Sequence, residues 1–300
     1  MRIGIFGGDT AGRSLETVIA DARDAESQGF ASYCLPQIFA ADALTTLALV
    51  GREVPRIELA TGVVPTYPRH PMMLAQQALT VQAAIGGRLA LGIGLSHQIV
   101  VENMFGYPFD QPARHLREYL SILGPLVRDG AVSFDGETLH AHGAVTVEGA
   151  SPFPILVAAL GPKLLGLAAT LADGTVTWMT GPATLASHTI PTITAAAARA
   201  GRPAPRIACA LPVCVTDDVD AARLRAAVEF EVYGMLPSYR AMLDREGAAG
   251  PADVAVVGDE ATVRGAIEHL DEIGVTDFVA SEFGSRADRE RTRTLLASLV

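Results

Sequence analysis

The chain contains 300 residues, of which 49% are hydrophobic, and it carries a formal net charge of −10. This length suits one large α/β barrel or two ordinary domains, and the apolar content is ample for a large core. The negative charge argues against nucleic acid and against an anionic membrane as partners.

Three cysteines lie in apolar, strand-like runs without the spacing of a metal site, namely Cys34, Cys209 and Cys214. An odd number of buried thiols is typical of a reducing compartment. Residues 1 and 2 lead directly into an apolar strand, so we expect no signal peptide. No apolar run reaches the roughly 18 residues of a membrane span, so we expect a cytoplasmic protein without membrane contact.

Apolar, β-branched runs alternate with amphipathic runs of helical period along the chain. Buried strands are predicted at residues 2–6, 30–35, 57–64, 88–93, 155–159, 174–179, 207–215 and 277–281. Helices are predicted at residues 14–28, 42–50, 72–85, 112–128, 163–171, 182–200, 217–245, 260–273 and 286–299. The segment at 217–245 is expected to be broken near Gly234 and Pro237. We expect residues 98–110 to be irregular and residues 132–147 to form an inserted hairpin.

Residues 57–97 are the most informative stretch because they hold a complete βαβ unit. Gly62 interrupts the first strand, Pro71 suits the first turn of the helix, and Gly86-Gly87 ends that helix. The loop at residues 94–97 then follows the C-terminal end of the second strand. In parallel α/β sheets and barrels, ligands bind at this end.

The alternation of strand and helix predicts a (β/α)8 TIM barrel formed by one domain, residues 1–300, with a small inserted hairpin. A doubly wound open sheet is the alternative interpretation of the same alternation. No linker, low-complexity tract or short repeat divides the chain.

Two loops share one design, in which a strand is followed by glycine, proline and a helix. They are residues 158–163, which end in Lys163, the only lysine of the chain, and residues 179–182. A helix N-terminus offers unpaired N–H groups and partial positive charge, which suit a phosphate. These loops follow the fifth and sixth predicted strands, whereas the usual barrel phosphate site follows the seventh and eighth. An ordinary turn between strand and helix is therefore the alternative.

The pair His140-x-His142 resembles the metal-binding pair of amidohydrolases, but it falls in the predicted hairpin and lacks a carboxylate–lysine set. We therefore expect no metal. His97 ends the loop after a strand, and His70 suits either a helix cap or a site. The Arg69 side chain is expected to pair with a carboxylate. A solvated helix face is expected for four polar residues: Arg114, His115, Arg117 and Glu118.

Three motifs go beyond these general patterns: TGVVPTYPRHP at residues 61–71, LAQQA at 74–78 and GRLALGIG at 87–94. They resemble the luciferase-like monooxygenase superfamily and are most similar to its actinobacterial branch, which uses coenzyme F420, a deazaflavin. Shorter motifs agree in order, so the resemblance spans nearly the whole chain. They lie at residues 25–30, 172–174, 257–259 and 274–278.

The resemblance implies a (β/α)8 barrel, like that of bacterial luciferase, that binds the deazaflavin at its C-terminal rim. By analogy it also implies a homodimer. A cis peptide without proline is implied near Gly62-Val63, behind the cofactor ring, and the glycine–proline loops would hold the phosphate. The residues implied to bind the cofactor are Gln37, Thr61, Gly62, Val63, Gly94, Leu95, Ser96, His97, Ala159, Leu160, Gly161, Pro162, Lys163, Met179, Thr180, Gly181 and Pro182.

Some relatives place a catalytic histidine at the end of the second strand, where this chain has Pro36-Gln37. Gln37 can form hydrogen bonds but cannot transfer protons near neutral pH. The proton donor is therefore expected elsewhere or from water. The candidate catalytic residues are His97, Gln37, Tyr67 and His70, and the candidate apolar walls, each equally suited to the core, are Tyr67, Phe105 and Trp178.

The resemblance thus implies an oxidoreductase that transfers hydride between C5 of F420 and a small organic substrate. One alternative is an FMN-dependent luciferase-like monooxygenase. A second is a non-catalytic deazaflavin-binding protein, which the replacement of the histidine by Gln37 suggests. A third is a metal hydrolase on the same barrel.

Overall fold

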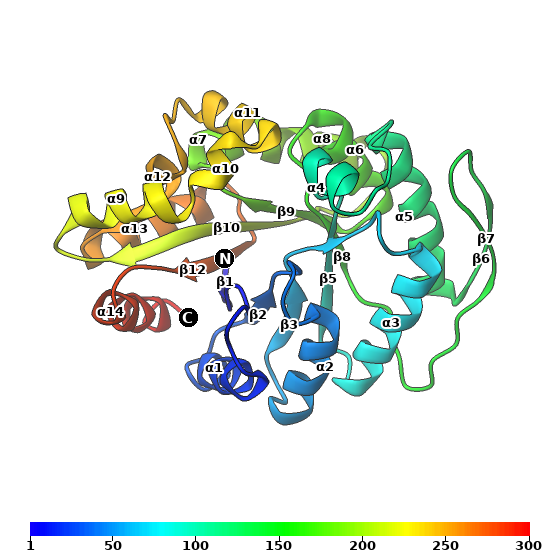
Figure 1. Cartoon of the computed structure of the whole chain (residues 1–300), viewed down its shortest axis with the longest axis horizontal. Helices are drawn as coiled ribbons and strands as arrows, with labels where there is room; N and C mark the ends of the chain where they lie inside the picture. Colours follow the sequence, from blue (N-terminus) through cyan, green and yellow to red (C-terminus); the bar gives the residue numbers. More distant parts are fainter.

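The strands of the computed structural model, which describes residues 1–300, form a closed parallel barrel (Figure 1). β1 pairs with β2 and with β12, and β9 pairs with β10, so the order closes on itself. The predicted (β/α)8 barrel is thereby confirmed, since an open sheet would leave two unpaired edges. The barrel strands are β1 (Arg2–Phe6), β2 (Ser32–Leu35), β3 (Glu58–Thr61), β5 (Leu89–Gly94), β8 (Ile155–Val157), β9 (Gly174–Trp178), β10 (Arg206–Val215) and β12 (Asp277–Glu282).

The barrel strands are apolar because both of their faces are buried. Every residue of β2 and of β5 is buried. Side chains on one face fill the interior, and those on the other pack against the helices. A single cluster of 60 buried hydrophobic residues joins strands and helices, and it includes Ile5, Leu47, Leu59, Leu91 and Leu120.

The third strand is interrupted where the sequence predicts it. β3 ends at Thr61, and β4 (Val64–Pro65) resumes the pairing with β5. The peptide bond between Gly62 and Val63 is cis, as expected from the family resemblance. A further strand, β11 (Val256–Gly258), pairs with β10 outside the barrel and was not predicted, because three residues carry no periodic signal.

Most helices begin and end close to their predicted limits. Asp42 caps its helix as expected, because its carboxylate accepts a hydrogen bond from the backbone N–H of Thr45 at 2.9 Å. None of the helices combines the length and apolar composition needed to cross a bilayer. The helices that match predictions are α1 (Leu15–Ser27), α2 (Ala43–Glu53), α3 (Pro71–Ala84), α5 (Pro112–Asp129), α6 (Pro162–Leu171), α13 (Glu260–Glu272) and α14 (Arg286–Ala297).

Three segments differ from their predictions. Residues 98–110 are not wholly irregular, because they contain α4 (Gln98–Asn103), a helix too short to show an apolar period. The helical segment predicted at residues 217–245, with breaks near Gly234 and Pro237, is three helices, and a further short helix follows. The break at Leu236 agrees with the prediction, whereas the bend at Phe230 was not predicted. They are α9 (Val219–Glu229), α10 (Glu231–Met235), α11 (Pro237–Glu246) and α12 (Pro251–Val254). The helix predicted at 182–200 contains a π-helical turn, η1 (Leu185–Thr189), between α7 (Pro182–Thr184) and α8 (Ile190–Arg199).

The predicted hairpin is confirmed as β6 (Ala131–Asp135) and β7 (His140–Ala144), and it projects from the edge of the barrel (Figure 1). Glu118 on α5 holds its turn. The Glu118 carboxylate accepts hydrogen bonds from three backbone N–H groups and from the Thr138 hydroxyl, at 2.7–3.0 Å. The prediction of a solvated face was wrong for Glu118, which is 6% exposed, because the turn donors required an acceptor.

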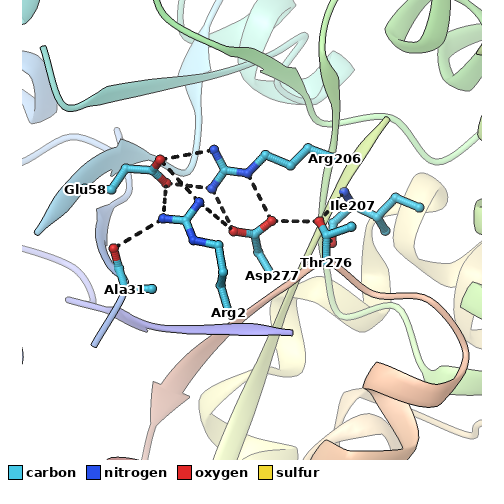
Figure 2. Close-up of polar contacts among 7 residues, drawn as sticks. All are labelled: Arg2, Ala31, Glu58, Arg206, Ile207, Thr276 and Asp277. Carbon is cyan, nitrogen blue, oxygen red and sulfur yellow. Dashed lines mark hydrogen bonds and ion pairs between the residues drawn. The ribbon is translucent and has the colours of Figure 1, made fainter. Parts of the chain in front are cut away.

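Charged residues close the N-terminal end of the barrel (Figure 2). Arg206 lies between two carboxylates, with nitrogen–oxygen distances of 2.6 Å to Glu58 and 2.7 Å to Asp277. Arg2 contacts the same two carboxylates at 3.2 Å. Burial alone would raise the pKa of Asp277, but the hydrogen bonds and charge of Arg206 hold it below its ordinary value. This end is therefore occupied by mutually paired charges, and a cofactor site is expected at the other end.

Candidate active site at the C-terminal rim

Aromatic rings and a glycine form the floor of the C-terminal mouth. Phe6 at the end of β1 stacks on Trp178 at the end of β9, with ring centroids 5.7 Å apart and planes at 16°. A Cβ on Gly62 would lie 3.0 Å from Cε2 of Phe6 and 2.7 Å from Sγ of Cys34. Only glycine therefore lets the interrupted third strand approach the mouth. The buried Nε1–H of Trp178 has no acceptor, so the floor also offers one free donor.

The helices that follow β10 cover this floor. Tyr233 on α10 meets Trp178 edge to face at 5.7 Å, and Tyr239 on α11 meets Tyr233 in the same way at 5.4 Å. The Tyr239 ring also lies 5.5 Å from the His97 ring. These segments therefore bring the rings of His97, Tyr233 and Tyr239 together with Trp178 over the C-terminal end of the barrel. The sequence analysis missed Tyr233, Tyr239 and Phe6, because nothing local in the sequence places them at the mouth.

Two residues at the rim adopt the left-handed backbone region although they are not glycine. They are Ser96, with φ of 62°, two residues after the end of β5, and Met179, with φ of 54°, directly after β9. Residues other than glycine are uncommon in this region, and where they occur they cluster at functional sites. Both belong to the predicted cofactor-binding residues, so the backbone itself marks these two loops.

The first glycine–proline loop leaves its helix start open. Gly161 caps α6 without any side-chain hydrogen bond, and no atom lies within 4 Å of the position that a Cβ would take. Lys163 in the first turn is exposed. The first turn of α6 therefore has no side-chain acceptor at its cap and carries an exposed cation, an arrangement that suits an anion. Ala159 and Leu160 precede it, with Ala159 fully buried.

The second glycine–proline loop is already occupied. The Glu246 carboxylate of α11 accepts hydrogen bonds from the backbone N–H groups of Ala183 and Thr184 at 3.0 and 2.6 Å. A Cβ on Gly181 would lie 2.3 Å from Cδ of that carboxylate. The structure therefore contradicts the expectation that Gly181 and Pro182 offer a free anion site here. The neighbouring Thr180 is fully buried.

His97 is the predicted catalytic residue best placed for chemistry. It lies at the N-terminus of α4 but does not cap the helix with its side chain. It is half-buried, and burial lowers its pKa below the ordinary value, so the ring is uncharged at neutral pH. An uncharged imidazole beside Tyr239 can accept a proton or a hydrogen bond.

Gln37 also lies at the rim, but its amide oxygen accepts a hydrogen bond from the backbone N–H of Ala43 at 2.8 Å. This contact joins the loop after β2 to the start of α2. Thr61 is engaged as well, since its hydroxyl donates to the Gly92 carbonyl at 2.8 Å and accepts from the Gly92 N–H at 2.9 Å. Its side chain ties β3 to β5 and is 2% exposed, so its hydroxyl is satisfied within the sheet.

The other two predicted catalytic residues lie apart from His97. The Tyr67 ring stacks on the His115 ring, with centroids 4.0 Å apart. Burial raises the pKa of the Tyr67 hydroxyl to about 12. His70 caps α3 by accepting from the Met72 N–H at 3.3 Å, and its Nε2 contacts the carbonyl of His140 in the hairpin at 3.2 Å. The structure thus gives His70 a structural role and places His115, expected to be solvated, in an aromatic stack.

The remaining predictions concern packing around the mouth. A Cβ on Gly94 would lie 2.8 Å from Cγ2 of Val63, so the Val63 side chain occupies the space that a larger residue at position 94 would need. Leu95, the next residue, is buried. The Arg69 side chain pairs with Asp42, as expected. His142 contacts Asp135 at 3.0 Å on the exposed hairpin, and no group of three or more potential metal ligands converges anywhere in the chain.

The family model described as luciferase-like monooxygenase matches residues 1–277 of this chain. An F420-dependent glucose-6-phosphate dehydrogenase of Intrasporangium calvum is 32% identical over 141 residues, which cover 45% of this chain and 42% of that protein. A 5,10-methylenetetrahydromethanopterin reductase of Archaeoglobus fulgidus is 36% identical over 133 residues, which cover 44% and 39%. The chain thus spans less than half the length of each of these two relatives.

Solved structures agree in fold over nearly the full chain. The coenzyme F420-dependent tetrahydromethanopterin reductase of Methanopyrus kandleri superposes with a TM-score of 0.82 at 22% identity, covering 100% of this chain and 97% of that one. The oxygenating constituent of 3,6-diketocamphane monooxygenase of Pseudomonas putida, in complex with FMN, gives 0.76 at 18%, covering 99% and 96%. Both cofactor types therefore occur on this fold.

Proposed function

We propose that this protein, which belongs to the luciferase-like monooxygenase family, is an F420-dependent oxidoreductase that transfers hydride between C5 of the deazaflavin and a small organic substrate. The F420-dependent relatives identified by sequence and by fold support the cofactor class. A homodimer and a cytoplasmic location remain predictions.

One juxtaposition carries the proposal. The only open glycine–proline helix start, at α6 with Lys163, lies on the same rim as the Phe6–Trp178 stack. The α6 N–H groups and Lys163 would hold the phosphate of the cofactor. The aromatic floor and the Gly62-Val63 segment would hold its ring. The residues present therefore fit an anion joined to a flat ring.

When bound, the deazaflavin supplies the hydride chemistry, and the protein supplies orientation, electrostatics and exclusion of water. Tyr233 and Tyr239 cover the mouth and shield it from solvent. His97 is the group that would accept a proton from a substrate hydroxyl, because its ring is uncharged and adjacent to the covered space.

Two alternative functions are each favoured by one observation. An FMN-dependent monooxygenase is favoured by the FMN-bound structural neighbour. A non-catalytic deazaflavin-binding protein is favoured by Gln37, whose amide supports a loop and transfers no proton.

Fluorescence titration of the purified chain with oxidised F420, and in parallel with FMN, tests the cofactor. We expect saturable F420 binding that is at least about tenfold tighter than FMN binding, because an affinity difference of that size corresponds to one well-placed interaction. The reverse preference would assign the protein to the flavin monooxygenases. Binding of F420 without turnover of alcohols, enones or imines would favour the non-catalytic deazaflavin-binding protein.

A further inference from the structure

Apolar side chains form an exposed collar beside His97. We define the collar as five exposed side chains and one half-buried ring from the loop after β2 and the α4 segment. The exposed fractions are 43% for Ile38, 60% for Phe39, 60% for Ile99, 59% for Met104 and 45% for Tyr107, and Phe105 is half-buried. Large apolar side chains gathered in one place on a surface mark a binding site more often than scattered ones do.

The collar is a built part of the rim. Phe39 and Phe105 meet edge to face, with centroids 6.2 Å apart, although their loops follow different strands. The backbone N–H groups of Phe105 and Tyr107 donate to the carbonyls of Val100 and Val101 at 3.1 and 3.0 Å, which fixes the end of α4. The collar is also continuous with the site, because Gln37 precedes Ile38 and His97 begins α4.

The charges around the collar exclude an anionic ligand. No lysine or arginine occurs in residues 37–43 or 97–111, whereas Asp42, Glu102 and Asp110 do. Arg114, the nearest arginine in sequence, is paired with Glu137, and Arg69 is paired with Asp42. On the rim, only Lys163 stands at an open helix start, and it is assigned above to the cofactor phosphate. A phosphorylated or carboxylated substrate would therefore meet negative charge without a partner cation.

We infer that the substrate of this site is an uncharged molecule with an extended apolar body, which lies across Phe39 and Phe105 while its reacting group reaches His97. This inference rests on the proposed function. The apolar collar replaces the cationic contacts that a sugar phosphate would need. Binding energy from the remote apolar body would position the reacting carbon, as is usual when distant contacts orient a substrate.

The chain provides its own reporter for this proposal, since Trp178 is the only tryptophan and lies on the floor of the mouth. We would titrate the full-length protein, with and without F420, with linear alkan-2-ones from butan-2-one to decan-2-one and follow Trp178 fluorescence. Affinity is expected to rise about two- to fourfold per methylene, as burial of each CH2 requires. Alkanoates of equal length are expected to bind at least about tenfold more weakly.

Substitutions in the collar test whether its side chains, rather than any exposed apolar side chain, bind the alkanone. Phe39→Ala and Phe105→Ala are each expected to weaken decan-2-one about tenfold and to leave butan-2-one unchanged, while Phe39→Leu stays close to wild type. Leu224→Ala is the matched control, because Leu224 on α9 is 71% exposed and away from the rim. An affinity independent of chain length, or a preference for alkanoates, would overturn the inference.

Two further readouts keep the proposals distinct. F420 titration of the same variants is expected to give unchanged affinity. Failure of the wild-type protein to bind any alkanone while it binds F420 would refute the substrate class alone. Alkanone binding without F420 binding would keep the collar and refute the proposed cofactor. If Phe39→Glu converts a dimer into a monomer in light scattering, the collar is covered by a second copy of this chain and the inference is wrong.

Discussion

The carboxylate of Glu246 lies 2.6 Å from the backbone nitrogen of Thr184, 62 residues earlier in the chain. It thereby ties α11, which carries Tyr239 over the mouth, to the first turn of α7. Two loops with the same glycine–proline design are therefore used differently. The α7 start is satisfied by a protein carboxylate, whereas the α6 start is left for an external anion.

Replacement of Glu246 by alanine should free the α7 start. We expect a loss of about 1–3 kcal/mol in the free energy of unfolding, because hydrogen bonds from two N–H groups to a charged acceptor are removed. Inorganic phosphate should then raise the melting temperature more for Glu246→Ala than for wild type. Glu246→Gln, which keeps an acceptor, serves as the control. Equal phosphate effects in all three proteins would contradict an anion role for this helix start.

Lys163→Met should weaken F420 binding about tenfold, because one partly exposed cation near a phosphate contributes on the order of 1 kcal/mol. Methionine keeps the aliphatic stem, so packing of α6 is unaffected. Lys163→Arg retains the charge and is expected to bind F420 within about twofold of wild type. Fluorescence titration measures both, and equal losses in the two variants would refute the electrostatic role.

His97→Asn should lower kcat by a factor of about 100 to 10,000, which is the usual contribution of a general base. Since burial depresses the pKa of His97, its neutral form predominates at pH 7 and is lost only as pH falls below 6.5. The wild-type rate for alcohol oxidation is therefore expected to fall on the acid side of that value, and the variant should lack this limb. His70→Asn keeps a good helix cap and should change kcat little.

Arg206→Met should destabilise the fold by up to about 3–5 kcal/mol, since it leaves the carboxylates of Glu58 and Asp277 with Arg2 as their only shared partner. The Asp277 side chain is 4% exposed, so solvent cannot replace the lost contacts. Arg286→Ala removes a pair in which the arginine side chain is 90% exposed, and is expected to leave the stability almost unchanged. Urea unfolding measures the stability of both variants. Similar losses of unfolding free energy would show that the charged cluster at the N-terminal end of the barrel does not stabilise the fold specifically.

Glu118 should make stability depend on pH in a narrow range. Burial opposes its ionisation, but hydrogen bonds from Thr138 and the turn N–H groups lower its pKa to about 2. Because the folded pKa is depressed, the stabilisation is complete above about pH 4.5 and is lost as pH falls toward 2. Glu118→Gln should flatten this part of the profile in urea unfolding between pH 3 and 6. If the unfolding free energies of Glu118→Gln and wild type change with pH in the same way, other carboxylates control the pH dependence of stability.

Local patterns predicted much of the barrel because strands and helices follow from periodicity and from capping residues within a few positions. The βαβ unit at residues 57–97 is the clearest case, with Pro71 at the helix start and the interruption at Gly62 both observed. The break before Pro237 was also predicted, because proline disfavours a helix interior. The short α4 and the bend at Phe230 escaped prediction, because segments of a few residues show no period.

The candidate site was predicted only in part, for a physical reason. The sequence by itself determined which strands form the barrel and where its rim loops lie, since both are encoded by neighbouring residues. Only the tertiary structure decided which polar groups at that rim remain free. Glu246 fills one of two equivalent helix starts, and the cap formed by His70 and the loop contact of Gln37 engage those side chains. Hydrogen-bond partners distant in sequence settle what is left for a ligand, and no local pattern records them.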